Sequence, residues 1–309
     1  MPGRCRRCIE SRLRSGRRAA GHSVKACGNP RARLGDISFL NCAPIRWGLA
    51  DSGAVHDVDM VSAPPEQLSA LLLSGDLDIS PISVVRYLRH TEELSLLPGI
   101  AIGSDGPVGS CHIVSRDPLE ALDGRVVALS AASRSTSLLA RMLLEDAVGV
   151  RPEYRTLRQD VGAMLRTARA AVVIGDDALR VRAAAPEGLT VHDTGAMWRS
   201  WTGLPMVFAV WAVRRDFARD RPETVREVGA ALVDAVARAR AHLARVAAAA
   251  ARGDRSRALG EPVLLDYFRT LDYSLGERQL AAVQEFSARA AGRGETVRPL
   301  PARIPVHGG

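Results

Sequence analysis

Neutral polar side chains, rather than charged ones, end several apolar segments of this sequence. Asn41 ends a short apolar run, Ser83 ends another, and Ser110 follows Gly109 at the end of a glycine-rich stretch. Amide and hydroxyl groups donate and accept hydrogen bonds without carrying a charge. Such residues can bind and orient a small polar molecule, although none of them is a strong base.

A second group of hydroxyls stands at the start of the helix predicted over residues 135–148. Unpaired backbone N–H groups and the helix dipole make a helix N-terminus a site for anions. Thr136 and Ser137 would add donors directed at a carboxylate. The alternative is that Ser133 or Ser135 simply caps the helix.

The remaining candidates each have a structural alternative. Asn41 either contacts a ligand or caps the helix that begins near Pro44, and Gly109 either lets the backbone approach a ligand or serves as a hinge. Asp176 follows an apolar strand and either contacts ligand or caps the next helix. Trp198 and Thr202 belong to a mixed apolar and polar cluster, which either forms a cleft wall or packs in the core.

The distribution of charge excludes several functions. Ten of the 42 Lys and Arg residues and one of the 34 acids lie in residues 1–33, so the other 276 residues, with 32 Arg and 33 acids, are nearly neutral. The high pI is therefore no argument for nucleic-acid binding. The single lysine is Lys25, which excludes a Schiff-base lysine or a Walker-type phosphate loop in residues 34–309.

No cofactor or metal is expected. A glycine fingerprint for dinucleotides is missing after the predicted strands, and the histidines are not paired at metal-ligand spacing. Five cysteines in a chain of this length do not suggest a disulfide framework. The sequence has no apolar run of membrane-spanning length and no signal-peptide core. We therefore expect a cytoplasmic protein whose partner is a small molecule, not a nucleic acid or a membrane.

The order of elements predicts an α/β fold with two lobes. Short strands alternate with helices up to residue 106, which predicts a parallel sheet, and a second α/β unit follows. A strand at 206–213, a long helix at 223–251 and two further helices complete the chain. We expect residues 1–33 to be a disordered basic extension, 34–106 and 207–309 to form lobe 1, and 107–206 to form lobe 2. A ligand cleft would lie between the lobes.

Five motifs, taken in order, resemble the chorismate dehydratase family of the futalosine route to menaquinone. They are Ile37-Ser-Phe-Leu-Asn41, Asp78-Ile-Ser-Pro-Ile-Ser83, Ser135-Thr-Ser-Leu138, Val173-Ile-Gly-Asp-Asp-Ala-Leu179 and Trp198-x-x-x-Thr-Gly-Leu-Pro205. The likeness extends from about Leu34 to near the C-terminus. The family has a type II periplasmic-binding-protein fold without a signal peptide, so the resemblance implies two lobes around a cleft.

The resemblance also implies an activity, the conversion of chorismate to 3-[(1-carboxyvinyl)oxy]benzoate with loss of water. Carried over by motif, Asn41 and Ser110 become the catalytic or substrate-orienting residues. Ser83, Thr136 and Ser137 become contacts to the carboxylates or the ring. Because no protein base is evident among these residues, we expect substrate-assisted elimination, in which a carboxylate of chorismate takes the proton.

Two alternatives remain open from the sequence. The sister enzyme that makes 1,4-dihydroxy-6-naphthoate shares several motifs, but it has a histidine base where this chain has Gly175, which favours the dehydratase. A cytoplasmic binding module for a small anion would share the fold and cleft without catalysis. The oligomeric state cannot be predicted.

Overall fold

The computed structural model describes residues 31–254 and 256–298. Most of the extension expected at residues 1–33 therefore lies outside the described residues. Strand β1 begins at Ala32, two residues before the expected boundary. Ala32 and Arg33 belong to the strand because they pair with Val58 and Asp59 of the neighbouring strand, and the backbone N–H and the guanidinium of Arg33 both donate to Asp78.

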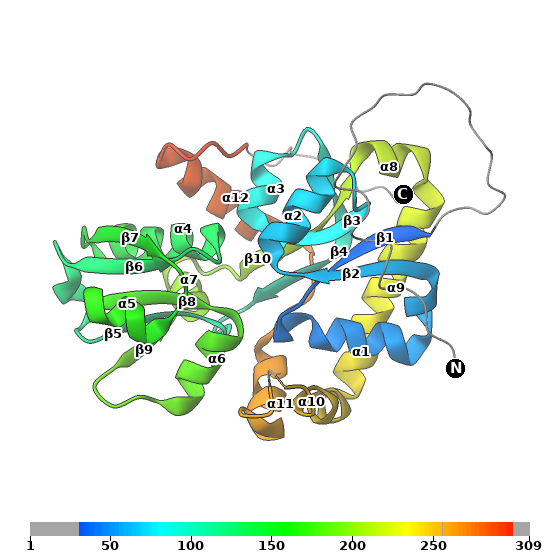
Figure 1. Ribbon diagram of the computed structural model, residues 1–309. Helices are drawn as coiled ribbons and strands as arrows, with labels where there is room; N and C mark the ends of the chain where they lie inside the picture. Colours follow the sequence, from blue (N-terminus) through cyan, green and yellow to red (C-terminus); the bar gives the residue numbers. More distant parts are fainter. Residues whose placement is uncertain (1–30, 255, 299–309) are drawn as a thin grey trace, which may run out of the picture. The chain divides into compact units, whose positions relative to one another are not determined.

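The first sheet has five strands in the order β2-β1-β3-β10-β4 (Figure 1). Their bounds are β1 Ala32–Ile37, β2 Val58–Ala63, β3 Ile79–Ser83, β4 Leu94–Ser104 and β10 Met206–Arg214. The helices between or after these strands are α1 Ala43–Ser52, α2 Pro65–Ser74, α3 Val84–Arg89, α8 Arg215–Asp220, α9 Pro222–Ala241, α10 Leu243–Ala251, α11 Gly260–Thr270 and α12 Glu277–Gly292.

The second sheet also has five strands, in the order β7-β6-β8-β5-β9. They are β5 Cys111–Ser115, β6 Val126–Ser130, β7 Glu153–Leu157, β8 Ala170–Ile174 and β9 Thr190–Asp193. The helices of this part are α4 Arg134–Met142, α5 Val161–Thr167, α6 Gly175–Ala184 and α7 Thr194–Thr202, and a π-helical turn, Leu143–Val148, continues α4. Both faces of the sheet are covered, each by its own cluster of buried apolar residues.

Both sheets are mixed, so the expectation of a parallel sheet is only partly right. β1 pairs in parallel with β2 and β3, but β10 is antiparallel to both β3 and β4. The chain reaches β10 from the second sheet, after β9 and α7, and not through a crossover helix between two neighbouring strands of the first sheet. The right-handed crossover rule therefore does not set the direction of β10. In the second sheet β5 is likewise antiparallel to β8 and β9.

The long helix expected at residues 223–251 is two helices. α9 ends at Ala241 and α10 begins at Leu243, because His242 has non-helical dihedral angles of φ −132° and ψ 33°. The break lets α10 pack against α11 while α9 packs along α1. Apolar periodicity continues through residue 242, which is why the sequence pattern misses the bend.

The largest cluster of buried apolar residues extends from the first sheet to helices that pack beside the second sheet. It contains residues of the first sheet together with Leu139 and Met142 from α4, Leu179 from α6 and Trp198 from α7. Burial of such side chains contributes about 1.5–3 kcal/mol each. Among the described helices, none is long and apolar enough to cross a membrane.

Candidate functional site

A cavity of about 80 Å³ lies where strand ends of the two sheets meet. Four residues expected to act on a ligand line it, namely Asn41, Ser83, Ser110 and Thr136. Asn41 and Ser83 follow or end strands of the first sheet, whereas Ser110 precedes β5 and Thr136 lies in α4. The carboxyl ends of β1, β3 and β8 thus supply residues to one cavity, as expected for ligand sites of α/β sheets.

Asn41 lies in a short 3-10 turn, Leu40–Cys42, directly after β1. The helix-capping alternative is wrong, because the residue at the N-cap of α1 is Cys42 and no side chain caps that helix. The buried Oδ1 atom of Asn41 has no hydrogen-bond partner in the described structure. A buried acceptor without a partner is costly unless a ligand or water supplies a donor.

Ser110 is 5% exposed and is held by two hydrogen bonds. Its Oγ accepts a hydrogen bond from the Tyr267 hydroxyl at 3.0 Å, and its carbonyl accepts one from the N–H of Gly175 at 2.8 Å. Its backbone continues into β5 through Cys111, whose thiol also lines the cavity. Burial raises the pKa of the Cys111 thiol to about 12, so this cysteine is neither a base nor a thiolate nucleophile near neutral pH.

The three hydroxyls at the start of α4 make different hydrogen bonds. Ser133 is the cap, with its Oγ accepting from the N–H of Thr136 at 3.2 Å and donating to Thr136 Oγ1 at 3.2 Å. Ser135 Oγ instead accepts from the N–H of Val85 at 3.3 Å, which connects α4 to α3. Thr136 Oγ1 therefore accepts from Ser133, and it also lies 3.8 Å from the Cys111 sulfur, a contact in which either atom could be the donor.

The electrostatics of the cavity favour an anion although no cationic side chain lines it. The N-terminal residues of α4 and α6 lie at the cavity, and Asn41 precedes the N-terminus of α1. Each helix N-terminus carries a partial positive charge and unpaired N–H groups. Glu66 is the one charged residue in the lining; its side chain is 46% exposed and lies 3.6 Å from Arg86. The site can thus bind negative oxygens through neutral donors.

Comparison with known proteins agrees with these features. The family model described as menaquinone biosynthesis matches residues 32–292. The chain belongs to the menaquinone biosynthesis family. This confirms the family expected from the five motifs. A curated relative from Thermus thermophilus, named chorismate dehydratase, is 34% identical in an alignment of 198 residues that covers 59% of this chain and 70% of the relative.

Solved structures similar to this member of the menaquinone biosynthesis family show its fold. A protein from Archaeoglobus fulgidus aligns with a TM-score of 0.69 and 18% identity, over 85% of this chain and 98% of that one. The periplasmic aliphatic sulphonate binding protein of Escherichia coli aligns with a TM-score of 0.63 and 18% identity, over 87% and 96% of the two chains. The expected periplasmic-binding-protein-like fold is thereby confirmed.

Two of the expected binding residues, Ser137 and Asp176, do not line this cavity. Ser137 is next to Thr136 on α4 and therefore points in another direction; its Oγ donates to the carbonyl of Ser130 at 3.2 Å, beside a separate surface groove. The carboxylate of Asp176 accepts from the N–H of Leu40 at 3.0 Å and lines a neighbouring pocket. Asp176 thus supports the turn that carries Asn41 from outside the cavity.

Trp198 and Thr202 pack rather than form a cleft wall. Trp198 is fully buried, and its indole N–H donates to the carbonyl of Pro205 at 3.0 Å. Thr202 Oγ1 donates to the carbonyl of Trp198 at 2.9 Å and accepts from the N–H of Leu204 at 3.2 Å. These bonds shape the end of α7, so the packing alternative holds for both residues.

Gly109 lies beside the cavity lining and serves the turn before Ser110. Its φ of +75° is in the left-handed region, and a Cβ there would lie 3.2 Å from the Tyr267 ring and 2.8 Å from Arg182. The conformation and the close packing both require glycine. These contacts are with other residues of the chain, so they support a structural role for Gly109 in this turn rather than close approach of its backbone to a ligand.

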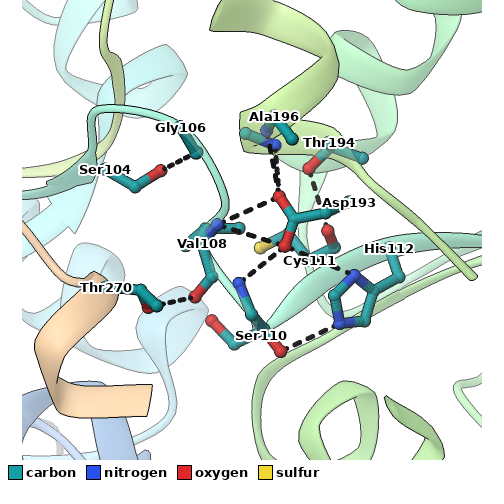
Figure 2. Close-up of polar contacts among 12 residues, drawn as sticks. Ser104, Gly106, Val108, Ser110, Cys111, His112, Asp193, Thr194, Ala196 and Thr270 are labelled. Carbon is teal, nitrogen blue, oxygen red and sulfur yellow. Dashed lines mark hydrogen bonds and ion pairs between the residues drawn. The ribbon is translucent and has the colours of Figure 1, made fainter. Parts of the chain in front are cut away.

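Asp193 is not among the site residues expected from the sequence. Its carboxylate accepts hydrogen bonds from the N–H groups of Val108, Gly109, Gly195 and Ala196, at 2.7–3.1 Å (Figure 2). It thus caps α7 and holds the chain that leads to Ser110. An aspartate before Thr-Gly is a typical capping signal, but its bonds to residues 85 positions away leave no trace in the sequence.

Within the described residues there is no group of three or more His, Cys, Asp or Glu side chains that could hold a metal ion. His112 is 1% exposed, and its ring contacts the Gly109 carbonyl and lies near Asp193 (Figure 2).

Proposed function

We propose that this protein is a chorismate dehydratase that converts chorismate to 3-[(1-carboxyvinyl)oxy]benzoate and water. The motifs, the menaquinone biosynthesis family and the name of the Thermus thermophilus relative support this substrate. The cavity adds a chemical argument, because chorismate has two carboxylates and a ring hydroxyl, and the lining offers hydroxyls, helix N-termini and an amide acceptor.

The reaction we propose is an elimination assisted by the substrate. One carboxylate of chorismate takes the hydrogen from the ring carbon beside the hydroxyl, and the electrons of that C–H bond form a ring double bond. The C–O bond breaks at the same time, and the leaving hydroxide takes that proton from the resulting carboxylic acid to become water, which regenerates the carboxylate. The ring becomes aromatic, so the step requires positioning more than a strong protein base.

Asn41 and Ser110 would supply that positioning. The unpartnered Oδ1 of Asn41 can accept a hydrogen bond from the ring hydroxyl and so orient it, and Ser110 can donate a hydrogen bond to developing negative charge. The hydroxyls of Ser83 and Thr136 and the helix N-termini would hold the carboxylates. The observation that carries the proposal is this convergence of neutral donors and an acceptor with no buried base among them.

The deciding experiment is incubation of the purified protein with chorismate. We expect chorismate to disappear and an aromatic product, identified by mass and NMR, to appear in equal amount. An Asn41→Ala variant is the matched control for a contaminating activity. Tight binding of chorismate without turnover would instead support the anion-binding module, and a product obtained only from a different substrate would exclude the dehydratase.

The naphthoate-forming alternative is not supported by the site. Gly175 lines the cavity at the position where the sister enzyme has its histidine, and a Cβ there would lie 3.4 Å from the Phe39 ring. The cavity therefore has no imidazole at this point.

A further inference from the structure

Two buried tyrosines from the C-terminal part of the chain reach the two proposed catalytic residues. The Tyr267 hydroxyl donates to Ser110 Oγ at 3.0 Å, and the Tyr273 hydroxyl donates to the carbonyl oxygen of Asn41 at 2.6 Å. The partners are 157 and 232 residues apart in sequence. Both tyrosines are 3% exposed, and neither lines the cavity.

The backbone that carries these tyrosines is fixed to the first sheet. Asp272 and Gly103 exchange two backbone hydrogen bonds of 2.7 and 2.8 Å, and the N–H of Ala101 donates to the carbonyl of Tyr273 at 2.9 Å. Thr270 Oγ1 donates a hydrogen bond to the carbonyl oxygen of Val108 at 3.3 Å. The Tyr267 hydroxyl is therefore presented to Ser110 from a rigid support.

The chain around Ser110 is held from the opposite side as well. Asp193 accepts from the N–H groups of Val108 and Gly109, and the Tyr267 ring packs where Gly109 has no side chain. Ser110 thus sits between an aspartate of the second sheet and a tyrosine of α11. Such a two-sided support is what a precisely oriented hydroxyl needs.

The direction of the Tyr267 bond determines what Ser110 can do. A serine hydroxyl has one proton and two lone pairs, and here one lone pair is occupied by the tyrosine proton. Burial raises the pKa of Tyr267 well above its ordinary value, so the phenol remains a donor at any physiological pH. The remaining proton of Ser110 can then be donated to the Cys111 sulfur or to a ligand in the cavity, and acceptance from Tyr267 makes Ser110 a stronger donor.

We propose that Tyr267 is a positioning residue of the reaction, which acts through Ser110 by fixing its hydroxyl as a donor to the oxygen that gains negative charge. This inference rests on the proposed function. Because Tyr267 does not touch the cavity, its contribution belongs to the chemical step and not to the affinity for chorismate.

The test is a double-mutant cycle on kcat and KM for chorismate with Tyr267→Phe, Ser110→Ala and the double variant. Tyr267→Phe keeps the ring contact with Phe268, whose centroid is 5.6 Å away, and removes the hydroxyl alone. We expect kcat to fall about 10-fold, with KM changed less than about twofold, as for loss of one hydrogen bond. In the Ser110→Ala background the same change should have no further effect on kcat.

Tyr87→Phe is the matched control, because Tyr87 is 1% exposed and its hydroxyl makes no hydrogen bond to another described residue. It should leave kcat unchanged. An unchanged kcat in Tyr267→Phe, or losses that multiply in the double variant, would overturn the inference, since the hydroxyl would then act independently of Ser110.

A second measurement does not depend on the folding of Tyr267→Phe. The chain has four tyrosines, so tyrosine labelled with ¹³C at the ζ carbon gives four resonances. We expect the Tyr267 resonance to shift in Ser110→Ala and to shift again when chorismate is added to the wild-type protein. Absence of both shifts would overturn the inference. An inactive wild-type protein whose Tyr267 resonance still responds to Ser110→Ala would overturn the proposed function instead.

Discussion

The amide oxygen of Asn41 is buried and has no hydrogen-bond partner in the described structure. A ligand bound beside it should therefore offer a hydrogen-bond donor. A donor on the ligand, such as a ring hydroxyl, would satisfy it, whereas a negative oxygen would be repelled. In the proposed reaction, the neutral amide would therefore select both the substrate and its orientation. The identity of residue 41 matters through charge as well as through shape.

Asn41→Asp should reduce kcat by about 100-fold or more. Two like charges about 4 Å apart cost about 4 kcal/mol at an effective dielectric constant of 20, and the substrate already carries two carboxylates. Steady-state kinetics with chorismate measure the change, and Asn41→Ala separates loss of the amide from gain of the charge. If the aspartate variant is as active as the wild type, Asn41 has no direct role in the reaction.

Glu66→Gln tests whether the protein supplies the base. A general base contributes about 10²–10⁴-fold to rate, whereas a substrate-assisted reaction should lose less than about threefold in kcat when this carboxylate is removed. Glu66 is the suitable residue because it is the charged member of the lining. If kcat falls strongly while chorismate still binds, Glu66 and not the substrate carboxylate accepts the proton.

At the scale of elements, the segment between β4 and β5 joins the two sheets and ends at Ser110. It is held by a network that includes Asp193 and His112. The Nε2–H of His112 donates to the Gly109 carbonyl at 2.8 Å, and Nδ1 lies 3.7 Å from Asp193 Oδ2. Burial lowers the pKa of His112, assisted by Arg182 and opposed by the attraction of Asp193.

This lowered pKa predicts a loss of stability in acid. An unfolded histidine has a pKa of about 6.5, so below that pH the unfolded chain binds a proton that folded His112 does not. The free energy of unfolding therefore falls as the pH falls from about 6.5 to the folded pKa. Burial also lowers the pKa of His192, which adds to the same loss.

Urea unfolding of wild type and His112→Gln at about pH 7 and about pH 5 measures the effect. Glutamine can still donate to the Gly109 carbonyl, and we expect its stability to depend less on pH. The exposed His56 provides the control variant His56→Gln, which should behave as the wild type. An equal loss in acid for all three proteins would show that His112 does not contribute.

At the scale of the whole molecule, the cavity is smaller than a ligand site. About 80 Å³ is well below the roughly 300–1,000 Å³ of small-molecule pockets. Its walls come from both sheets, which are joined by the segment before Ser110 and by the one before β10. We therefore expect these parts to move apart when a substrate enters, with the connecting segments as hinges.

We expect the free protein in solution to have a larger radius of gyration than the protein saturated with chorismate. Small-angle X-ray scattering with and without chorismate measures this difference, and benzoate serves as a smaller anion for comparison. An identical radius of gyration in both states, together with tight binding, would mean that rearrangement of lining side chains such as Phe39 and Phe208 makes the room.

Local and regular features were accessible from the sequence. The alternation of short strands and helices, the glycine and proline boundaries, and the polar residues at strand ends all depend on neighbouring residues and on backbone hydrogen bonds within one element. The five motifs also sufficed for the family. The break at His242 was not accessible, because the apolar periodicity crosses it and packing against α11 decides the bend.

The residues available for the chemistry, a set of hydroxyls and one amide without lysine, could be identified before the fold was known. Which of them meet depends on the fold, which places Thr136 in the cavity and Ser137 outside it, and Trp198 in the core. It also brought Tyr267 and Asp193 to the two sides of Ser110's chain. Contacts between distant residues arise from packing of whole elements, and no local spacing encodes them.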